Sequence, residues 1–124
     1  MNIGVDMACF SEFSRILQNE KYKNFIFTDN ELALATNYSL SRQLEFLVGR
    51  FCAKEALVKA LGSGFLQEDM IKWKDIEILR NKKHAPIGIL YNNAKDTFHN
   101  KGYKEMKISI THKKDVVICS ALLY

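Results

Sequence analysis

The segment from residue 41 to residue 61 constrains the fold of this chain more than any other. Its apolar side chains follow no single stripe and cover most of the circumference of a helix: Phe46, Leu47, Val48, Phe51, Ala53, Ala56, Leu57, Val58 and Leu61. A helix that is apolar nearly all round is a buried helix. The segment therefore predicts a long helix that other elements cover on nearly all sides.

Two charged residues interrupt this apolar helix. Glu55 and Lys59 stand four residues apart on one face, close to Val48, Phe51 and Cys52. A carboxylate in these surroundings is costly unless a cation or a metal ion compensates its charge. Lys59 alone is one candidate, because a glutamate four residues before a lysine stabilises an isolated helix by roughly 0.2–0.5 kcal/mol.

The turn Gly62-Ser63-Gly64 follows the helix. A glycine after the last helical residue is a common helix ending, and a second glycine close behind it lets backbone approach a ligand without a Cβ atom in the way. The turn could therefore hold a phosphate group. Most turns of this composition are only turns, so the pattern needs support from other residues.

A second carboxylate lies in a short strand at the start of the chain. Residues 2–7 alternate, with Gly4 and Asp6 on one face and apolar side chains on the other. Asp6 has two interpretations. It could cap the helix that follows, which the spacing alone favours. It could also hold Mg²⁺ together with Glu55, because proteins bind this ion through one or two carboxylates plus the phosphates of a substrate.

The remaining pattern predicts an α+β fold with helices on a mostly antiparallel sheet. The segment 116–123 is apolar on both faces, which places it in the centre of the sheet. Thr28 and Glu31 form a capping box at the start of a short helix. The predicted order is a strand at 2–7, a helix from Phe10 that ends by Asn24, helices at 28–35 and 41–61, strands at 75–80 and 86–91, a helix containing Ala94 and Phe98, and strands at 104–111 and 116–123.

The composition is that of an ordinary globular protein. The chain has 124 residues, of which 48% are hydrophobic and 26% charged, so we expect one domain over residues 1–124. Its three cysteines, Cys9, Cys52 and Cys119, are too far apart to suggest a zinc site or a disulfide framework. No segment has the length of a membrane span and no signal-peptide pattern is present. We therefore expect a cytoplasmic protein that does not bind membranes.

The segments Gly4-Val5-Asp6 and 45–64 resemble the signature of the holo-acyl-carrier-protein synthases, the small 4′-phosphopantetheinyl transferases. The resemblance continues in order through residues 27–32, 75–79 and 108–112, so it covers nearly the whole chain. It implies the phosphopantetheinyl transferase fold, in the order strand, three helices, two strands, helix, two strands. It also implies a homotrimer, because family members of this length share each active site between neighbouring subunits.

The resemblance implies a magnesium-dependent phosphoryl transfer. The 4′-phosphopantetheine group of coenzyme A would pass to a serine of an apo acyl carrier protein, and adenosine 3′,5′-bisphosphate would leave. We expect fatty acid biosynthesis as the setting, with a polyketide or other specialised carrier as the alternative.

The same resemblance implies roles for individual residues. Asp6 and Glu55 would hold Mg²⁺, and Lys59 would lie beside the diphosphate. The general base stays open between a metal-bound water, Glu55 and His112. The coenzyme A contacts would come from Arg50 and His112 at the 3′-phosphate and ribose, from Lys59, from the turn Gly62-Ser63-Gly64, and from Pro86 at the adenine across the subunit boundary. Arg42 could add to the phosphate site, and Lys54 is either structural or near the phosphates.

The chain departs from the family pattern in three places. The mildest is the turn at residues 62–64, where the family's Gly-Thr-Gly is Gly-Ser-Gly and the hydroxyl is kept. A basic residue usually stands where this chain has Glu12, and Arg15 comes three residues later on the segment that docks the acidic carrier, together with Lys21 and Lys23. The usual Gly-Lys-Pro before the adenine strand is replaced by residues 84–86, His-Ala-Pro.

A non-catalytic nucleotide-binding or nucleic-acid-binding module is the rival interpretation. The net charge of +4 fits either a basic nucleic-acid binder or an enzyme that meets an acidic carrier. A nucleic-acid binder gathers its lysines and arginines on one surface with exposed aromatic rings. Here 18 basic residues are scattered among 14 acidic ones. We therefore expect an enzyme with no nucleic-acid partner.

Overall fold

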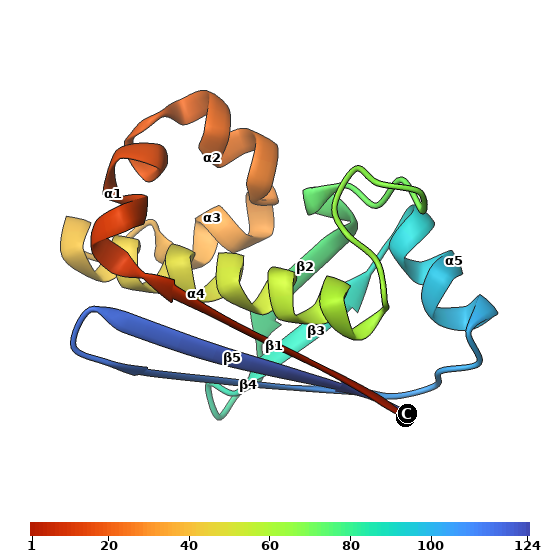
Figure 1. The fold of residues 1–124 in the computed structure, drawn as a ribbon. Coiled ribbons are helices and arrows are strands. Elements are labelled where there is room, and N and C mark those ends of the chain that lie inside the picture. The colour runs from red at the N-terminus through yellow and green to blue at the C-terminus, as the bar shows by residue number, and fades with distance from the viewer.

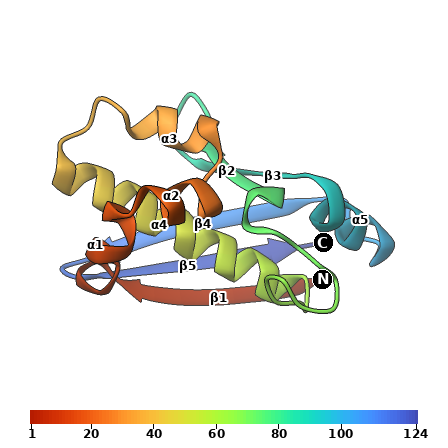
Figure 2. The ribbon, with the colours of Figure 1, turned by 90° about the horizontal axis from the view of Figure 1, so that it is seen from above.

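The computed structural model describes residues 1–124 and is built around one antiparallel sheet and one long helix. The sheet has the order β1 (Asn2–Cys9), β5 (Val116–Leu123), β4 (Met106–Lys113), so the strand predicted to be central lies in the middle. Helix α4 (Leu40–Ala60) lies across one face of this sheet (Figure 1). Seen from above, α4 crosses the strands diagonally, and its carboxyl-terminal end lies by β1 (Figure 2).

The remaining elements cover the other sides of α4. A two-stranded antiparallel sheet, β2 (Ile76–Arg80) and β3 (Pro86–Leu90), packs beyond it. The other helices are α1 (Phe10–Gln18), α2 (Glu20–Ile26), α3 (Asp29–Ala35), the 3₁₀ turn η1 (Trp73–Asp75) and α5 (Asn92–Asn100). The α+β prediction is thereby confirmed, although the strands form two sheets. No helix combines the length and the hydropathy needed to cross a membrane.

One predicted helix, from Phe10 to Asn24, is two helices in the structure. The break falls at Asn19, whose backbone is extended with φ −90° and ψ 114°. Its side-chain oxygen accepts hydrogen bonds from the amides of Lys21 at 2.9 Å and Tyr22 at 3.4 Å. Asparagine favours a helix N-terminus over a helix interior for this reason, so Asn19 ends α1 and begins α2.

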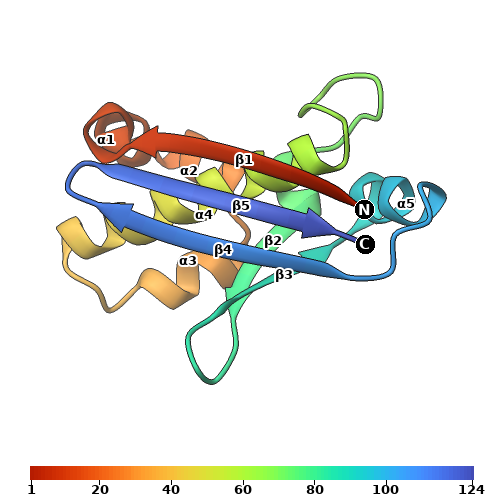
Figure 3. The ribbon, with the colours of Figure 1, turned by 60° about the horizontal axis from the view of Figure 1, so that its bottom comes forward.

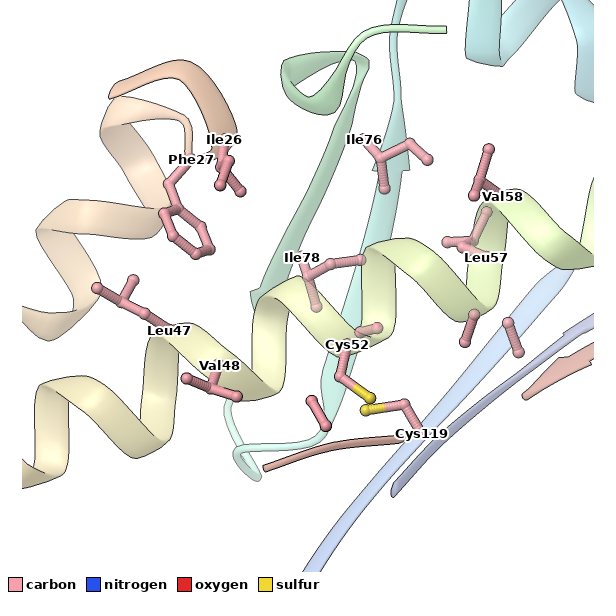
Figure 4. Packing of buried hydrophobic residues seen from close by; sticks show 14 of the residues in the cluster. Ile26, Phe27, Leu47, Val48, Cys52, Leu57, Val58, Ile76, Ile78 and Cys119 are labelled. Atoms are coloured by element: carbon pink, nitrogen blue, oxygen red, sulfur yellow. The ribbon is translucent and has the colours of Figure 1, made fainter. Parts of the chain in front are cut away.

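The core is continuous around α4, as the apolar circumference of this helix predicts. Buried side chains from α4, β2, β5 and the α2–α3 junction meet in one cluster, and in Figure 4 the thiols of Cys52 and Cys119 point toward each other. Strand β1 packs directly on the backbone of α4 at Gly4. A Cβ atom there would lie 1.9 Å from the carbonyl oxygen of Ala56. This close approach brings the next inward residue of β1, Asp6, against the last turns of α4.

The role of Lys54, left open by the sequence, is structural. This side chain is fully buried and its ammonium uses all three of its donors. The acceptors are Glu31 Oε1 at 2.7 Å, the carbonyl of Ile26 at 2.6 Å and the carbonyl of Trp73 at 3.2 Å. Glu31 also completes the predicted capping box with Thr28. Lys54 therefore fastens α4 to α2, α3 and η1.

The outer face of the three-stranded sheet carries apolar side chains that no element covers. Ile3, Val5 and Met7 of β1 are between 52% and 65% exposed, and Ile118 of β5 lies beside them at 44%. Figure 3 shows this face toward the viewer with no helix across it. Contiguous exposed apolar surface of this kind marks an interaction site.

Candidate active site

The first group of predicted site residues meets where β1 passes the end of α4. Lys59 Nζ donates to Asp6 Oδ1 at 2.8 Å and to the carbonyl of Val5 at 3.2 Å. Asp6 is largely buried, and the Lys59 side chain is half exposed. The simple pairing of Glu55 with Lys59 is not what the structure contains, because the Lys59 ammonium bonds to the carboxylate of Asp6.

The interpretation of Asp6 as a helix cap is wrong. Strand β1 continues to Cys9, so Asp6 lies inside the strand, opposite Cys119 of β5. The carboxylate at the start of α1 is that of Asp115, in the β4–β5 turn. It accepts a hydrogen bond from the amide of Ser11 at 3.0 Å. The Asp6 carboxylate is therefore free of any capping task.

Lys59 compensates the negative charge of Glu55 only in part. Burial raises the pKa of the Glu55 carboxyl, the negative charge of Asp6 raises it further, and Lys59 opposes both effects. The pKa of Lys59 is raised chiefly by its hydrogen bond to Asp6. One ammonium thus faces two carboxylates, and a further cation beside Glu55 would lower the pKa of its carboxyl.

The donor set fits a magnesium ion that binds together with a substrate. Asp6 and Glu55 come close enough for the charge of one to raise the pKa of the other. No group of three or more histidine, cysteine, aspartate or glutamate side chains is arranged to hold a metal. Two carboxylates alone suit Mg²⁺, which keeps several waters and takes its other ligands from phosphates, better than they suit calcium or zinc.

The glycine turn closes α4 next to this group. Gly62 has φ +74°, and its amide donates to the carbonyl of Lys59 at 2.9 Å. The amide of Ser63 donates to the carbonyl of Val58 at 3.1 Å, which completes a common helix ending. Both amides are therefore engaged by the helix. Of the three residues, Gly64 is the one whose amide has no backbone acceptor.

The second group of predicted residues lines a separate pocket of about 190 Å³. Arg50 of α4, Pro86 of β3 and His112 of β4 meet there. The rest of the lining comprises Phe10, Arg42, Glu45, Phe46, Gly49, His84, Ile110 and Val117. The sequence interpretation included Arg42 but gave His84 no task. The sequence does carry one indication of a role for His84, which is that a histidine replaces the glycine of the family pattern at this position.

Arg50 is held rigidly in this pocket. Its guanidinium stacks on the ring of Phe46 at 3.8 Å and donates to the carbonyls of Ile78 at 3.3 Å and Leu79 at 3.5 Å. Burial, followed by repulsion from Arg80, lowers the pKa of Arg50 to about 10. Two of its five N–H groups are used by backbone carbonyls, so three remain for an anion.

The two groups lie on different sides of α4. Asp6, Glu55 and Lys59 gather toward β1, whereas the pocket lies between α4, the β2–β3 loop and β4. No carboxylate of the first group and no residue of the glycine turn lines the pocket. One chain therefore carries two separate groups of predicted residues, and Pro86 lies in the same group as Arg50 and His112.

Comparison with known proteins gives the class. A family model described as "4'-phosphopantetheinyl transferase superfamily" matches residues 2–119. The holo-[acyl-carrier-protein] synthase of Clostridium kluyveri is 39% identical, over 98% of this chain and 87% of its own length. The corresponding enzyme of Alkaliphilus metalliredigens is 35% identical, over 97% and 95%. The chain therefore belongs to the 4′-phosphopantetheinyl transferase superfamily.

A solved structure agrees with this assignment. The holo-(acyl-carrier-protein) synthase of Bacillus anthracis, in complex with CoA (3′,5′-ADP), superposes with a TM-score of 0.81 and 30% sequence identity, covering 98% of this chain and 94% of that one. Within the superfamily the chain is a member of the holo-[acyl-carrier-protein] synthases and is an enzyme of that family.

Proposed function

We propose that this enzyme transfers the 4′-phosphopantetheine group of coenzyme A to a serine hydroxyl of an apo acyl carrier protein, in the cytoplasm and for fatty acid biosynthesis. Residues 1–124 would act as one transferase domain. The observation that carries the proposal is the meeting of Asp6, Glu55 and Lys59 between β1 and α4. The names of the relatives and the cofactor bound in the Bacillus anthracis enzyme support the choice of substrates.

The chemistry requires positioning and charge neutralisation more than a protein nucleophile. The serine oxygen forms a bond to the phosphorus that carries pantetheine, the bond from this phosphorus to the bridging oxygen breaks, and adenosine 3′,5′-bisphosphate leaves. Asp6 and Glu55 would hold Mg²⁺, which supplies charge neutralisation at the diphosphate when bound. Lys59 is fixed by Asp6 and places its ammonium beside the same group. Glu55 and His112 are the side chains of this chain that can take the serine proton.

A homotrimer would unite the two groups, each of which would then be a half-site of one active site. The carboxylate half-site lies at the β1 edge of the sheet whose outer face exposes Ile3, Val5 and Met7. A neighbouring subunit packed on this face can bring its own basic pocket to these carboxylates. Coenzyme A would then contact Asp6, Glu55 and Lys59 of one subunit and Arg50, Pro86 and His112 of the next.

Val5→Lys is expected to convert the oligomer into monomers and to reduce transfer to background, because it places a charge in the apolar face that subunits would bury. Light scattering after size exclusion measures the assembly. Asn100→Lys, which adds the same charge on the exposed surface of α5, should change neither assembly nor activity. A monomeric wild-type protein with full activity would contradict the shared site.

The carrier would dock on α1 and α2. Arg15 and Lys21 are exposed on these helices, and so are the rings of Tyr22 and Phe25 on α2, which offers both charge and apolar area to an acidic helix. Lys23, which the sequence placed in this surface, is partly buried and lies 3.5 Å from Glu20. Arg15 and Lys21 therefore supply most of the available charge.

Incubation with coenzyme A, Mg²⁺ and purified apo carrier proteins tests the function. We expect the mass of the carrier to rise by one phosphopantetheine group, and we expect EDTA to stop the reaction. Faster modification of a fatty-acid carrier than of a polyketide carrier would support the proposed setting. Failure with every carrier, together with tight oligonucleotide binding, would favour the binding module instead.

A further inference from the structure

His84 is a pocket residue that the proposed reaction does not yet use. It lies in the loop between β2 and β3, has φ +66° and lines the same pocket as Arg50 and His112. Glycine adopts this backbone conformation without steric cost, whereas other residues adopt it less readily. The loop nevertheless holds a histidine here.

Hydrogen bonds within the loop fix this conformation. The amide of His84 donates to the carbonyl of Asn81 at 2.9 Å. The side-chain oxygen of Asn81 accepts from the amides of Lys83 at 2.9 Å and Ala85 at 3.0 Å. The turn is therefore closed by Asn81 and by backbone groups, and the imidazole of His84 takes no part in it. The side chain is exposed and free to contact a ligand in the pocket.

The lining of the pocket suits a phosphate ester attached to a less polar group. Four side chains that carry N–H donors converge from three elements: Arg42 and Arg50 from α4, His84 from the β2–β3 loop and His112 from β4. The one carboxylate, Glu45, lies 3.6 Å from Arg42. Apolar walls complete the pocket, which at about 190 Å³ is smaller than a typical small-molecule site. It therefore takes one end of a ligand, and a phosphate with part of its ribose fits this chemistry.

We propose that His84 binds the 3′-phosphate of coenzyme A and so helps this enzyme to select coenzyme A over its form without that phosphate. The assignment rests on the proposed function, since it requires coenzyme A in this pocket. Arg50 supplies the fixed charge from α4, and His84 lines the same pocket from the β2–β3 loop. The family pattern has glycine at this position and lysine at the next, where this chain has Ala85. His84 thus supplies a side-chain N–H donor to the pocket, next to Ala85, which has none.

Steady-state kinetics of the full-length enzyme with coenzyme A and with 3′-dephospho-coenzyme A tests the proposal. His84→Gly and His84→Asn both tolerate a positive φ, so we expect unchanged melting temperatures. We expect KM for coenzyme A to rise roughly fivefold to tenfold, the size of one ordinary hydrogen bond in water. The value of kcat, and KM for the dephosphorylated cofactor, should stay at the wild-type level.

Lys83→Ala is the matched control, because it removes a charge from the same loop without touching the pocket lining. Its KM values should equal those of the wild type. An equal rise in KM for both cofactors in the His84 variants would overturn the phosphate contact, and so would no rise at all. A wild-type enzyme that uses neither cofactor would instead contradict the proposed function, which keeps the two failures apart.

Discussion

Replacing Glu55 with glutamine is expected to lower phosphopantetheinyl transfer by at least about a hundredfold at saturating Mg²⁺, because a lost metal ligand removes several kcal/mol of charge stabilisation in the transition state. The change keeps the shape of the side chain, so packing against α4 and β1 should be preserved. Transfer to an apo carrier, followed by mass spectrometry, measures the loss.

Thermal unfolding supplies a readout that does not depend on turnover. Burial and the charge of Asp6 both raise the pKa of Glu55, so its charged form is disfavoured in the metal-free protein. Without metal, Glu55→Gln should therefore melt at the wild-type temperature or above it. Added Mg²⁺ should raise the melting temperature of the wild type and not that of the variant.

Glu105→Gln is the control, since Glu105 is exposed and far from the proposed metal ligands in the sequence. It should keep both the activity and the metal response. Full activity in Glu55→Gln would mean that Glu55 holds no metal and that its position on α4 serves only the charge balance with Lys59.

Local patterns predicted much of the fold. The apolar circumference of residues 41–61 anticipated the buried helix α4 almost to its ends, since a helix with no polar face has to be covered on all sides. The capping box of Thr28 and Glu31 is present, because both of its hydrogen bonds lie within four residues. The central place of β5 followed from apolar side chains on both of its faces.

Local patterns could not predict contacts between residues that are distant in the sequence. The cap of α1 comes from Asp115, which is 104 residues away from Ser11. Lys59 bonds to Asp6 rather than to Glu55 because β1 packs against the backbone of α4 at Gly4, and nothing within the helix itself indicates this neighbour. The separation of the predicted site residues into two groups depends on the diagonal crossing of α4 and the sheet, which no local spacing encodes.

Lys54→Met is expected to cost about 3–5 kcal/mol of unfolding free energy, because it leaves the carboxylate of Glu31 buried without its cation. Burial lowers the pKa of Lys54, and Glu31 opposes that shift. Glu31 also accepts hydrogen bonds at 2.8 Å from the amides of Thr28 and Ile78. Loss of the ammonium therefore weakens the junction of α3, α4 and β2 at once. Urea unfolding measures the change, which is a large part of the roughly 5–15 kcal/mol that stabilises a typical domain.

The double variant Lys54→Met with Glu31→Gln separates the unpaired charge from the lost packing. Its amide oxygen can still accept one of the two backbone hydrogen bonds, and no buried charge remains, so we expect it to recover at least about 1 kcal/mol over the single variant. Lys95→Met, at an exposed position of α5, should change stability by less than about 0.5 kcal/mol. If Lys54→Met proved as mild as this control, the buried pair would contribute little, and the three carbonyl and carboxylate acceptors of Lys54 would have to be satisfied by water instead.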